Sequence, residues 1–436
     1  LGMNFRFSPK KNILSVYLTN SLWMLSENIL KIISGVFVGI YIARYLGPDQ
    51  FGLLSYSLAI VSIFMSVSRL GMESILVRDL TKYPDQANAY MGTAFGLMMM
   101  ASVAGFILLA NIIYLLETDP VTQFYILVIA VGILFQALLV IDYRFQSQVK
   151  AKYSSISKSI ALSVSSIIKV YLVWSQAEIL YFAIAYAIDH LIIAIVLSLM
   201  YFSKYNFNFF VAFSRKYVKR LLSSAWPMIM SGIAGIVLIR IDQLFIANML
   251  GMNQVGLYAA ASKIYEGWMT IIFVITISIL PMLIKLKEQS SEIYFDKLQH
   301  FFKLLFWSSV LFSIIVSTFS DSIINILFGL QFEESKDILA LMVWVSLFTS
   351  FGFMSARYLI VEGLQKKIAK RNWIAIMINI PSNYVLIPML GVNGAVISTM
   401  ISMFFAHYLL DYLDPDLVEL RKIKNSSLLL RRTYEQ

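Results

Sequence analysis

The chain has 436 residues, of which 59% are hydrophobic and only 14% are charged. Soluble proteins carry about 25% charged residues, so this composition excludes a water-soluble domain and also a disordered chain. The formal net charge is +10, with 35 Lys and Arg against 25 Asp and Glu, and a membrane protein has few places for so many cations. The absence of Cys excludes disulfides, thiolate nucleophiles and Cys-ligated metal sites.

Apolar stretches long enough to span a bilayer, about 20 residues each, follow one another along the whole chain. The first contains Glu27 and Lys31 and lacks a small-x-small cleavage site, so we interpret it as a span and not as a signal peptide. The sequence therefore predicts an all-α polytopic membrane protein with about twelve transmembrane helices, near residues 14–43, 52–72, 90–116, 122–142, 156–174, 179–201, 222–249, 257–284, 300–318, 338–361, 371–388 and 392–410.

The distribution of Lys and Arg outside these spans tests their predicted positions and number. With the N-terminus in the cytoplasm, 25 of them fall in cytoplasmic segments and only 2, Arg44 and Lys336, fall in outer loops. Cytoplasmic loops of membrane proteins are enriched in Lys and Arg. A missed span would exchange the cytoplasmic and outer assignments of all later loops, and the bias would be lost. We therefore expect both termini to lie in the cytoplasm, with short loops and no soluble domain between the spans.

A short motif occurs twice. Residues 42–53 (IARYLGPDQFGL) and 246–257 (IANMLGMNQVGL) share seven of twelve positions at an offset of 204 residues. Each copy is typical of a helix that ends at a glycine, followed by a tight turn and a new helix. Outer turns that look alike by chance are the alternative. Because the copies follow spans one and seven, we predict two parallel six-helix bundles around a central cavity.

The predicted organisation has four segments. They are an N-terminal bundle (1–203), a basic cytoplasmic linker (204–220), a C-terminal bundle (221–411) and a cytoplasmic tail (412–436). Ionisable residues inside spans are costly and mark either neutralising pairs or functional sites. Three pairs have the i,i+3 or i,i+4 spacing that lets their side chains touch on one helix: Glu27/Lys31, Arg69/Glu73 and Lys263/Glu266.

Four cations lie well inside spans and are the candidate substrate-binding residues: Lys31, Arg240, Lys263 and Arg357. A cavity lined by cations attracts an anion, and the planar guanidinium of Arg suits phosphate. An anionic lipid head group such as a pyrophosphate fits this set better than a cationic drug. Four acidic residues are candidates for tuning these cations or for coupling transport to H⁺ or Na⁺: Glu27, Asp242, Glu266 and Glu362.

Arg240 and Asp242 are only two residues apart on one predicted helix. Their side chains point in nearly opposite directions, so they cannot pair with each other in place. We expect one of them to face the interior of its bundle and the other to face a neighbouring helix.

Several functions lack support in the sequence. There is no phosphate-cradling Walker loop, the three His residues are scattered, and no nucleophile–His–acid signature is present. We therefore expect no catalytic residues, no metal site, no cofactor and no enzymatic activity. The basic loops are explained by topology and by anionic lipid, so nucleic acid is not an expected partner.

Five segments carry a family resemblance: ARYLGPDQFGLLSYSLAI (43–60), SRLGMESILVRDL (68–80), RIDQLFIANMLGMNQVGLYAAASKIYEGW (240–268), ARYLIVEGL (356–364) and LIPMLGVNGAVIST (386–399). With their order and spacing, they resemble the polysaccharide flippases of the Wzx type over residues 12–410. The superfamily also contains the multidrug and toxin extruders. Peptidoglycan-precursor flippases of the same superfamily typically have fourteen spans, so twelve favours the branch that handles sugar repeat units.

The resemblance implies a function. Such a protein moves an undecaprenyl-pyrophosphate-linked oligosaccharide, of O-antigen or a similar polysaccharide, to the periplasmic leaflet of a bacterial inner membrane. It would work beside the polysaccharide polymerase and the chain-length machinery. Two alternatives stay open from the residues: an ion-coupled multidrug antiporter of the same fold, in which the acidic residues form the site, and a non-transporting membrane scaffold for polysaccharide assembly.

Overall fold

The computed structural model describes residues 23, 26–205 and 209–428, and all structural statements below concern these residues. Every secondary-structure element in them is a helix, which confirms the all-α prediction. In a bilayer an apolar segment must satisfy its own backbone hydrogen bonds, and a helix does this within one segment.

The elements of the first half end in the long helix α9. In chain order they are η1 (Ser34–Val38), α2 (Gly39–Ser68), α3 (Met72–Lys82), η2 (Pro84–Gln86), α4 (Ala87–Leu116), α5 (Pro120–Ala130), η3 (Val131–Leu139), α6 (Val140–Ser147), α7 (Ala151–Trp174), α8 (Ile179–Phe202), η4 (Phe209–Val211) and α9 (Arg215–Leu250). Those of the second half are α10 (Met252–Gln289), α11 (Ser291–Thr318), α12 (Ser320–Leu327), η5 (Leu330–Phe332), α13 (Ser335–Met342), α14 (Val345–Val361), α15 (Lys366–Leu390), α16 (Val392–Phe404), η6 (Phe405–Leu409), α17 (Leu410–Leu413), η7 (Pro415–Leu417) and α18 (Val418–Leu428).

Ten of the described helical segments are long and apolar enough to cross a membrane, and α13 with α14 forms an eleventh, bent span. The first segment, Ser26–Lys82, has 57 residues. A helix of that length would measure roughly 85 Å, whereas the hydrocarbon core is about 30 Å thick. The backbone leaves the helical conformation at Gly47, between the predicted spans 14–43 and 52–72. This segment therefore holds two spans, and the polytopic prediction is confirmed. Residues 14–22, 24 and 25 of the first predicted span lie outside the described residues.

The two copies of the repeated motif have the same backbone shape. Gly47 has φ 74° and ψ 172°, and its counterpart Gly251 has φ 91° and ψ 175°. Positive φ at these angles is readily adopted only by glycine, which ends each helix and reverses the chain. The repeat read from the sequence is thus a repeat of local structure.

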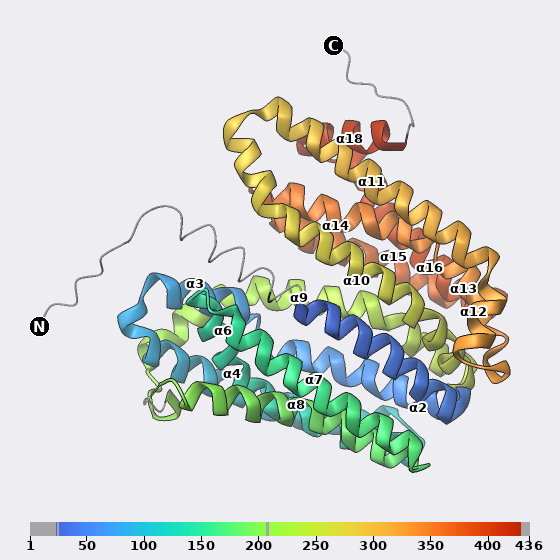
Figure 1. The fold of residues 1–436 in the computed structure, drawn as a ribbon, viewed down its shortest axis with the longest axis horizontal. Coiled ribbons are helices and arrows are strands. Elements are labelled where there is room, and N and C mark those ends of the chain that lie inside the picture. Colours follow the sequence, from blue (N-terminus) through green and yellow to red (C-terminus); the bar gives the residue numbers. More distant parts are fainter. Residues whose placement is uncertain (1–22, 24–25, 206–208, 429–436) are drawn as a thin grey trace, which may run out of the picture.

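The two halves lie close together at one end of the molecule and apart at the other. Figure 1 shows the helices from α2 to α8 in a lower group and those from α10 to α18 in an upper group, which meet at the right, near α12 and α13. We call the right-hand end, which carries α12 and α13, the turn face. The turn at Gly47 belongs to it, because a Cβ added to Gly47 would lie 3.3 Å from Gln331 of η5, and the turn at Gly251 lies beside it, because Gly52 contacts Met252. We call the left-hand end, which carries α3 and α6 in the lower group and the turn between α10 and α11 in the upper group, the basic face; α18 lies at the top of the upper group.

The hydrophobic core follows the same division. One cluster at the turn face includes Ile42 and Phe51 of the first half together with Phe328 and Phe332 of the second. Toward the basic face the core divides into a cluster of α3, α4 and α6 and a separate cluster of α10, α11, α14 and α18. Apolar packing therefore joins the halves at the turn face and not at the basic face.

Helix α9 belongs to both halves. Its residues Leu221 and Ala225 are buried in the basic-face cluster of the first half, whereas Leu238 and Ile246 lie in the shared cluster. Pro227 lies inside the helix just after the first of these stretches. The boundary predicted at residue 221 therefore falls within a continuous helix whose first turns pack on the N-terminal half.

Candidate functional site: a cation-lined space between two halves

The repeated turns form the contact between the halves at the turn face. A Cβ atom added to Gly52 would overlap the carbonyl oxygen of Met252 and lie 2.9 Å from the nitrogen of Gly256. A Cβ added to Gly256 would overlap the carbonyl oxygen of Pro48. The offset of 204 residues relates Gly52 to Gly256 and Pro48 to Met252, so the two contacts are equivalent by two-fold symmetry. We call this backbone-to-backbone contact the glycine seal.

Polar bonds across the halves surround the glycine seal. Asn253 donates to Asp49 at 3.1 Å, and these two residues are again 204 positions apart. Arg44 donates from Nη1 to the carbonyl of Ile326 at 3.0 Å, and Gln331 donates to the carbonyl of Arg44 at 2.6 Å. Arg44, one of two predicted outer-loop cations, therefore fastens the first half to the segment around α12.

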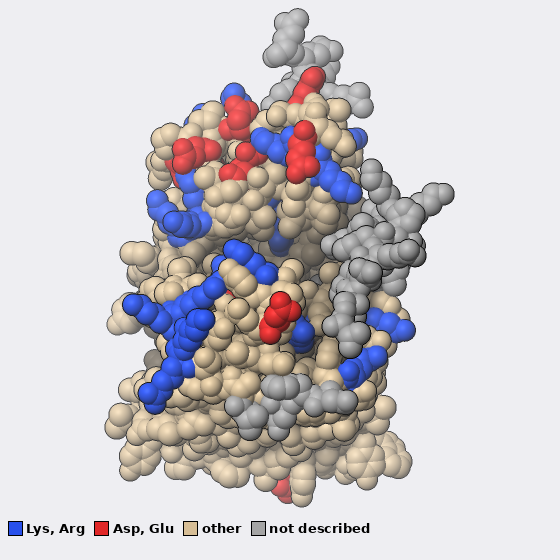
Figure 2. Space-filling model, turned by 90° about the vertical axis from the view of Figure 1, so that its left-hand side faces the viewer, with Lys and Arg blue, Asp and Glu red and all other residues tan. Residues whose placement is uncertain are grey.

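The basic face is open by comparison. Figure 2 shows Lys and Arg gathered on this face in both halves, and a hollow in the surface between the halves. The space between the two bundles is thus closed at the turn face and accessible from the basic face. Transporters built from two bundles use a space of this kind, which is closed at one end and open at the other.

Three of the predicted site residues come together beside this space. Arg240 of α9 donates to Glu266 of α10 at 3.0 Å, and their side chains are 27% and 32% exposed. Lys263 reaches across to the first half, because a Cβ added to Gly39 would lie 3.4 Å from its Cε and 3.8 Å from its Nζ. Glu266 thus pairs across helices with Arg240, and not with Lys263 on its own helix. The group thus holds two cations and one carboxylate, which leaves a net positive charge.

Lys31 lies on the first half and is exposed. It takes part in no ion pair among the described residues. Its predicted neighbour Glu27 instead bonds Ser155 at 2.9 Å and lies 3.6 Å from Lys158. Lys31 therefore adds a positive charge from the first half that no ion pair neutralises among the described residues.

Arg357 and Glu362 lie away from this group. The Arg357 guanidinium is 5.6 Å from the ring centre of Phe273, and its Nε is buried without a hydrogen bond among the described residues. Glu362 accepts two hydrogen bonds from Lys287, at 3.0 and 3.2 Å. This pair joins the basic-face ends of α10 and α14. Its position is suited to holding the two helices together.

We expected one of Arg240 and Asp242 to face the interior of its bundle and the other to face a neighbouring helix. Asp242 is the one that faces the interior of the second half. It is 2% exposed. Its Oδ1 accepts hydrogen bonds from Asn379 at 3.2 Å and Asn383 at 2.7 Å, and its Oδ2 accepts from Tyr258 at 2.9 Å and from Thr399. Four donors from three other helices therefore surround one buried carboxylate inside the membrane.

Two buried polar groups of the first half were not assigned as sites from the sequence. Lys169 of α7 pairs with Asp189 of α8 and lies 3.8 Å from the ring centre of Tyr186. Asp142 bonds Ser154 and pairs with Lys158 at 2.8 Å. Lys169 lies five residues before the end of α7 and Asp189 lies ten residues after the start of α8, so their spacing along the chain did not indicate the pair.

The comparisons with known proteins agree with this architecture. An inward-facing multidrug resistance transporter of the MATE family, in the MOP superfamily, superposes with a TM-score of 0.74 at 12% identity, covering 94% of this chain and all of that one. The lipid II flippase MurJ in an inward closed conformation gives 0.71 at 14% identity, covering 94% and 91%. The fold is therefore the one shared by MATE transporters and MurJ.

The sequence comparisons give the family. The model of the family described as polysaccharide biosynthesis protein matches residues 17–287, more than half of the chain, so the chain belongs to that family. The capsular polysaccharide biosynthesis protein CapF of Staphylococcus aureus is 24% identical over 392 residues, which cover 88% of this chain and 96% of CapF. The resemblance to polysaccharide flippases is thereby confirmed.

Proposed function

We propose that this protein is a flippase that moves an undecaprenyl-pyrophosphate-linked oligosaccharide repeat unit, of O-antigen or a similar polysaccharide, from the cytoplasmic to the periplasmic leaflet of a bacterial inner membrane. The observation that carries the proposal is the space between the halves, closed by the glycine seal and reached from the basic face, with Arg240, Lys263 and Lys31 beside it. The family supports the saccharide part of the substrate.

The charges favour a doubly charged anion as the cargo. Arg240 and Lys263 lie near a single carboxylate, that of Glu266, which pairs with Arg240, and Lys31 has no ion-pair partner among the described residues. A pyrophosphate supplies the missing negative charge and accepts hydrogen bonds from both Arg and Lys. The basic face is the cytoplasmic one in this proposal, because positive loops are retained on that side. Loading then occurs where the lipid-linked unit is made.

A transport assay tests the proposal directly. The purified chain is reconstituted into vesicles that carry lipid-linked oligosaccharide, and a membrane-impermeant glycosidase reports the fraction in the outer leaflet. We expect the accessible fraction to change only in vesicles that contain the protein. The same accessible fraction in vesicles with and without the protein would contradict the flippase function. Drug accumulation in the same vesicles tests the antiporter alternative, which the carboxylate of Asp242 keeps open.

We further propose that Asp242 and its polar neighbours couple transport to an ion. The carboxylate could bind H⁺ directly, or it could hold Na⁺ together with the side-chain oxygens of Thr399, Asn379 and Asn383. The Oδ1 of Asn383 is buried and accepts no hydrogen bond among the described residues. An oxygen with a free lone pair beside a buried carboxylate suits a small cation.

Asp242→Asn is expected to leave the chain in the membrane and to remove the response of transport to an imposed H⁺ or Na⁺ gradient. The amide cannot accept from all four donors, so we also expect a loss of stability of about 1–3 kcal/mol in detergent melting. Asp321→Asn is the control, because Asp321 is an exposed carboxylate whose ion-pair partner is the surface residue Lys336 and which makes no contact with Asp242 or its four donors. A variant with an unchanged gradient response would exclude Asp242 as the coupling group.

A further inference from the structure

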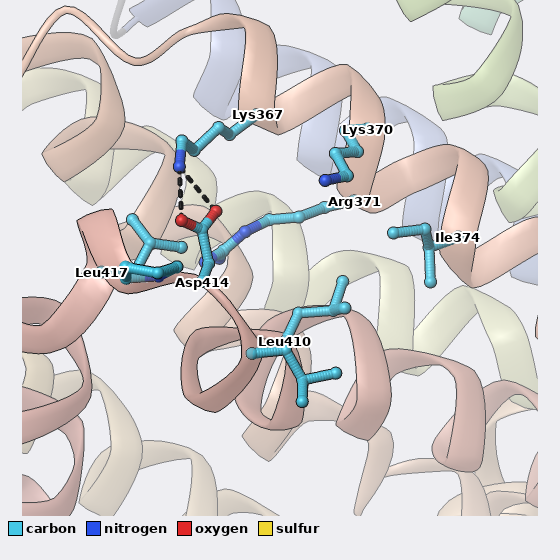
Figure 3. A pocket seen from close by; sticks show the side chains of 9 residues that line it. Lys367, Lys370, Arg371, Ile374, Leu410, Asp414 and Leu417 are labelled. Atoms are coloured by element: carbon cyan, nitrogen blue, oxygen red, sulfur yellow. Dashed lines mark hydrogen bonds and ion pairs between the residues drawn. The ribbon is translucent and has the colours of Figure 1, made fainter.

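A second basic site lies on the basic face of the second half, away from the space between the halves. It is a cavity of about 260 Å³ between the first turns of α15 and the segment that follows α17. Figure 3 shows Lys370 and Ile374 on one side of it, Asp414 and Leu417 on the other, and Leu410 below. The transport proposal above makes no use of this cavity.

The cavity has more positive than negative charge. Its lining includes Lys367, Lys370 and Arg371 but only one carboxylate, that of Asp414. Lys367 donates to both oxygens of Asp414 at 2.6 Å. Burial alone would raise the pKa of Asp414, but the hydrogen bond from Lys367 holds this pKa below its usual value. The one negative group is thus already neutralised, and Lys370 has no ion pair among the described residues.

Arg371, which also lines the cavity, has a hydrogen-bond donor with no acceptor among the described residues. Arg371 is only 4% exposed, and it pairs with the buried Asp411. Its Nη1 is buried and makes no hydrogen bond among the described residues. A buried donor without a partner is costly, and an anion in the cavity would satisfy it.

The surroundings place the cavity at the level of lipid head groups. Trp373 and Tyr412, which flank its lining residues in the sequence, are 37% and 44% exposed. Aromatic residues of this kind mark the membrane–water boundary. Leu413, which also lines the cavity, is 78% exposed and offers an apolar wall. The site therefore combines cations for a phosphate with apolar side chains for the glycerol and acyl groups.

We propose that this cavity binds the phosphate of an anionic phospholipid in the leaflet on the basic face. Lys370 and Arg371 contact the phosphate, and Ile374, Leu410 and Leu413 contact the apolar part of the lipid. The bound lipid joins the start of α15 to the segment that leads into α18. Basic pockets of this kind on the cytoplasmic side of membrane proteins are suited to anionic head groups.

The test measures lipid binding and does not involve transport. Delipidated protein in detergent is titrated with phosphatidylglycerol, and the melting temperature gives an apparent dissociation constant. We expect Lys370→Gln to weaken binding about fivefold, the effect of one cation near an anionic head group. The matched control is Lys366→Gln, which removes an exposed charge one turn away that does not line the cavity. We expect it to bind as the unchanged protein does.

Three outcomes would overturn the proposal. Equal weakening in both variants would mean only a general attraction between charges. Equal stabilisation by phosphatidylethanolamine would remove the preference for an anionic lipid, and equal stabilisation by inorganic phosphate would make the ligand a free ion. Native mass spectrometry of the two variants gives a second readout, in which Lys370→Gln is expected to retain less phosphatidylglycerol than Lys366→Gln.

Discussion

Gly52→Ala and Gly256→Ala are each expected to abolish export of the polysaccharide while the protein remains in the membrane at its usual level. In either variant the new methyl group overlaps backbone of the other half, which cannot move aside as a side chain could. Overpacking of this kind costs about 1–3 kcal/mol, which shifts a two-state equilibrium by roughly 5- to 150-fold. The state with a closed turn face becomes the minor one.

A single cysteine can report this shift, because the chain contains no Cys of its own. Gly35 is exposed, and a Cβ added there meets no atom within 4 Å. It lies one turn from Lys31 and one turn from Gly39, which faces Lys263 of the other half. With Gly35→Cys, we expect an impermeant thiol reagent to react from the basic side, and from the other side once Gly52→Ala is added.

Gly235→Ala is the matched control for the seal. It also lies in a membrane-spanning helix near a contact between helices, but its nearest atom would be 4.0 Å away, so we expect normal export and normal labelling. Normal export by Gly52→Ala, with labelling still only from the basic side, would show that the glycine seal does not control access.

Arg240→Gln is expected to lower transport at least tenfold, whereas Glu266→Gln retains most of it. Hydrogen bonds between a charged donor and an anion contribute about 1.5–3 kcal/mol, which corresponds to roughly 10- to 150-fold. Removing Glu266 leaves Arg240 and Lys263 available for the pyrophosphate. Transport in vesicles measures the effect, and the melting temperature shows whether each variant is folded.

The double variant Arg240→Gln/Glu266→Gln separates binding from structure. If the ion pair only joined α9 to α10, both single changes would be equally harmful, and the double change would restore transport because no charge is left unpaired. We expect the double variant to remain inactive. Restored transport would move the anion site away from Arg240.

The sequence predicted the spans well because hydropathy and loop charge act locally along the chain. The same holds for the turns at Gly47 and Gly251, whose shape depends on a glycine in the turn itself. That the two turns pack on each other could not be read from the sequence, because no spacing along the chain encodes a contact between halves. This contact became visible only when Gly52 and Gly256 were placed in space.

The site residues were predicted as a set but not as an arrangement. Arg240, Lys263 and Glu266 do lie together, whereas spacing on one helix suggested the pair Lys263/Glu266. The partner of a charge in a membrane is decided by how helices rotate against their neighbours, and hydropathy does not report rotation. Glu362 shows the same limit, because its partner Lys287 comes from another helix.

The shared helix α9 has a consequence for how the protein is made. Leu221 and Ala225 fill part of the core of the N-terminal half, although they are the beginning of the seventh span. While the ribosome is still synthesising that span, the first six helices are already in the membrane with an unfilled apolar groove beside α3 and α4. The N-terminal half therefore completes its folding only after the chain has passed its midpoint. The two halves, although each carries a copy of the repeated turn, are not separate units of biosynthesis.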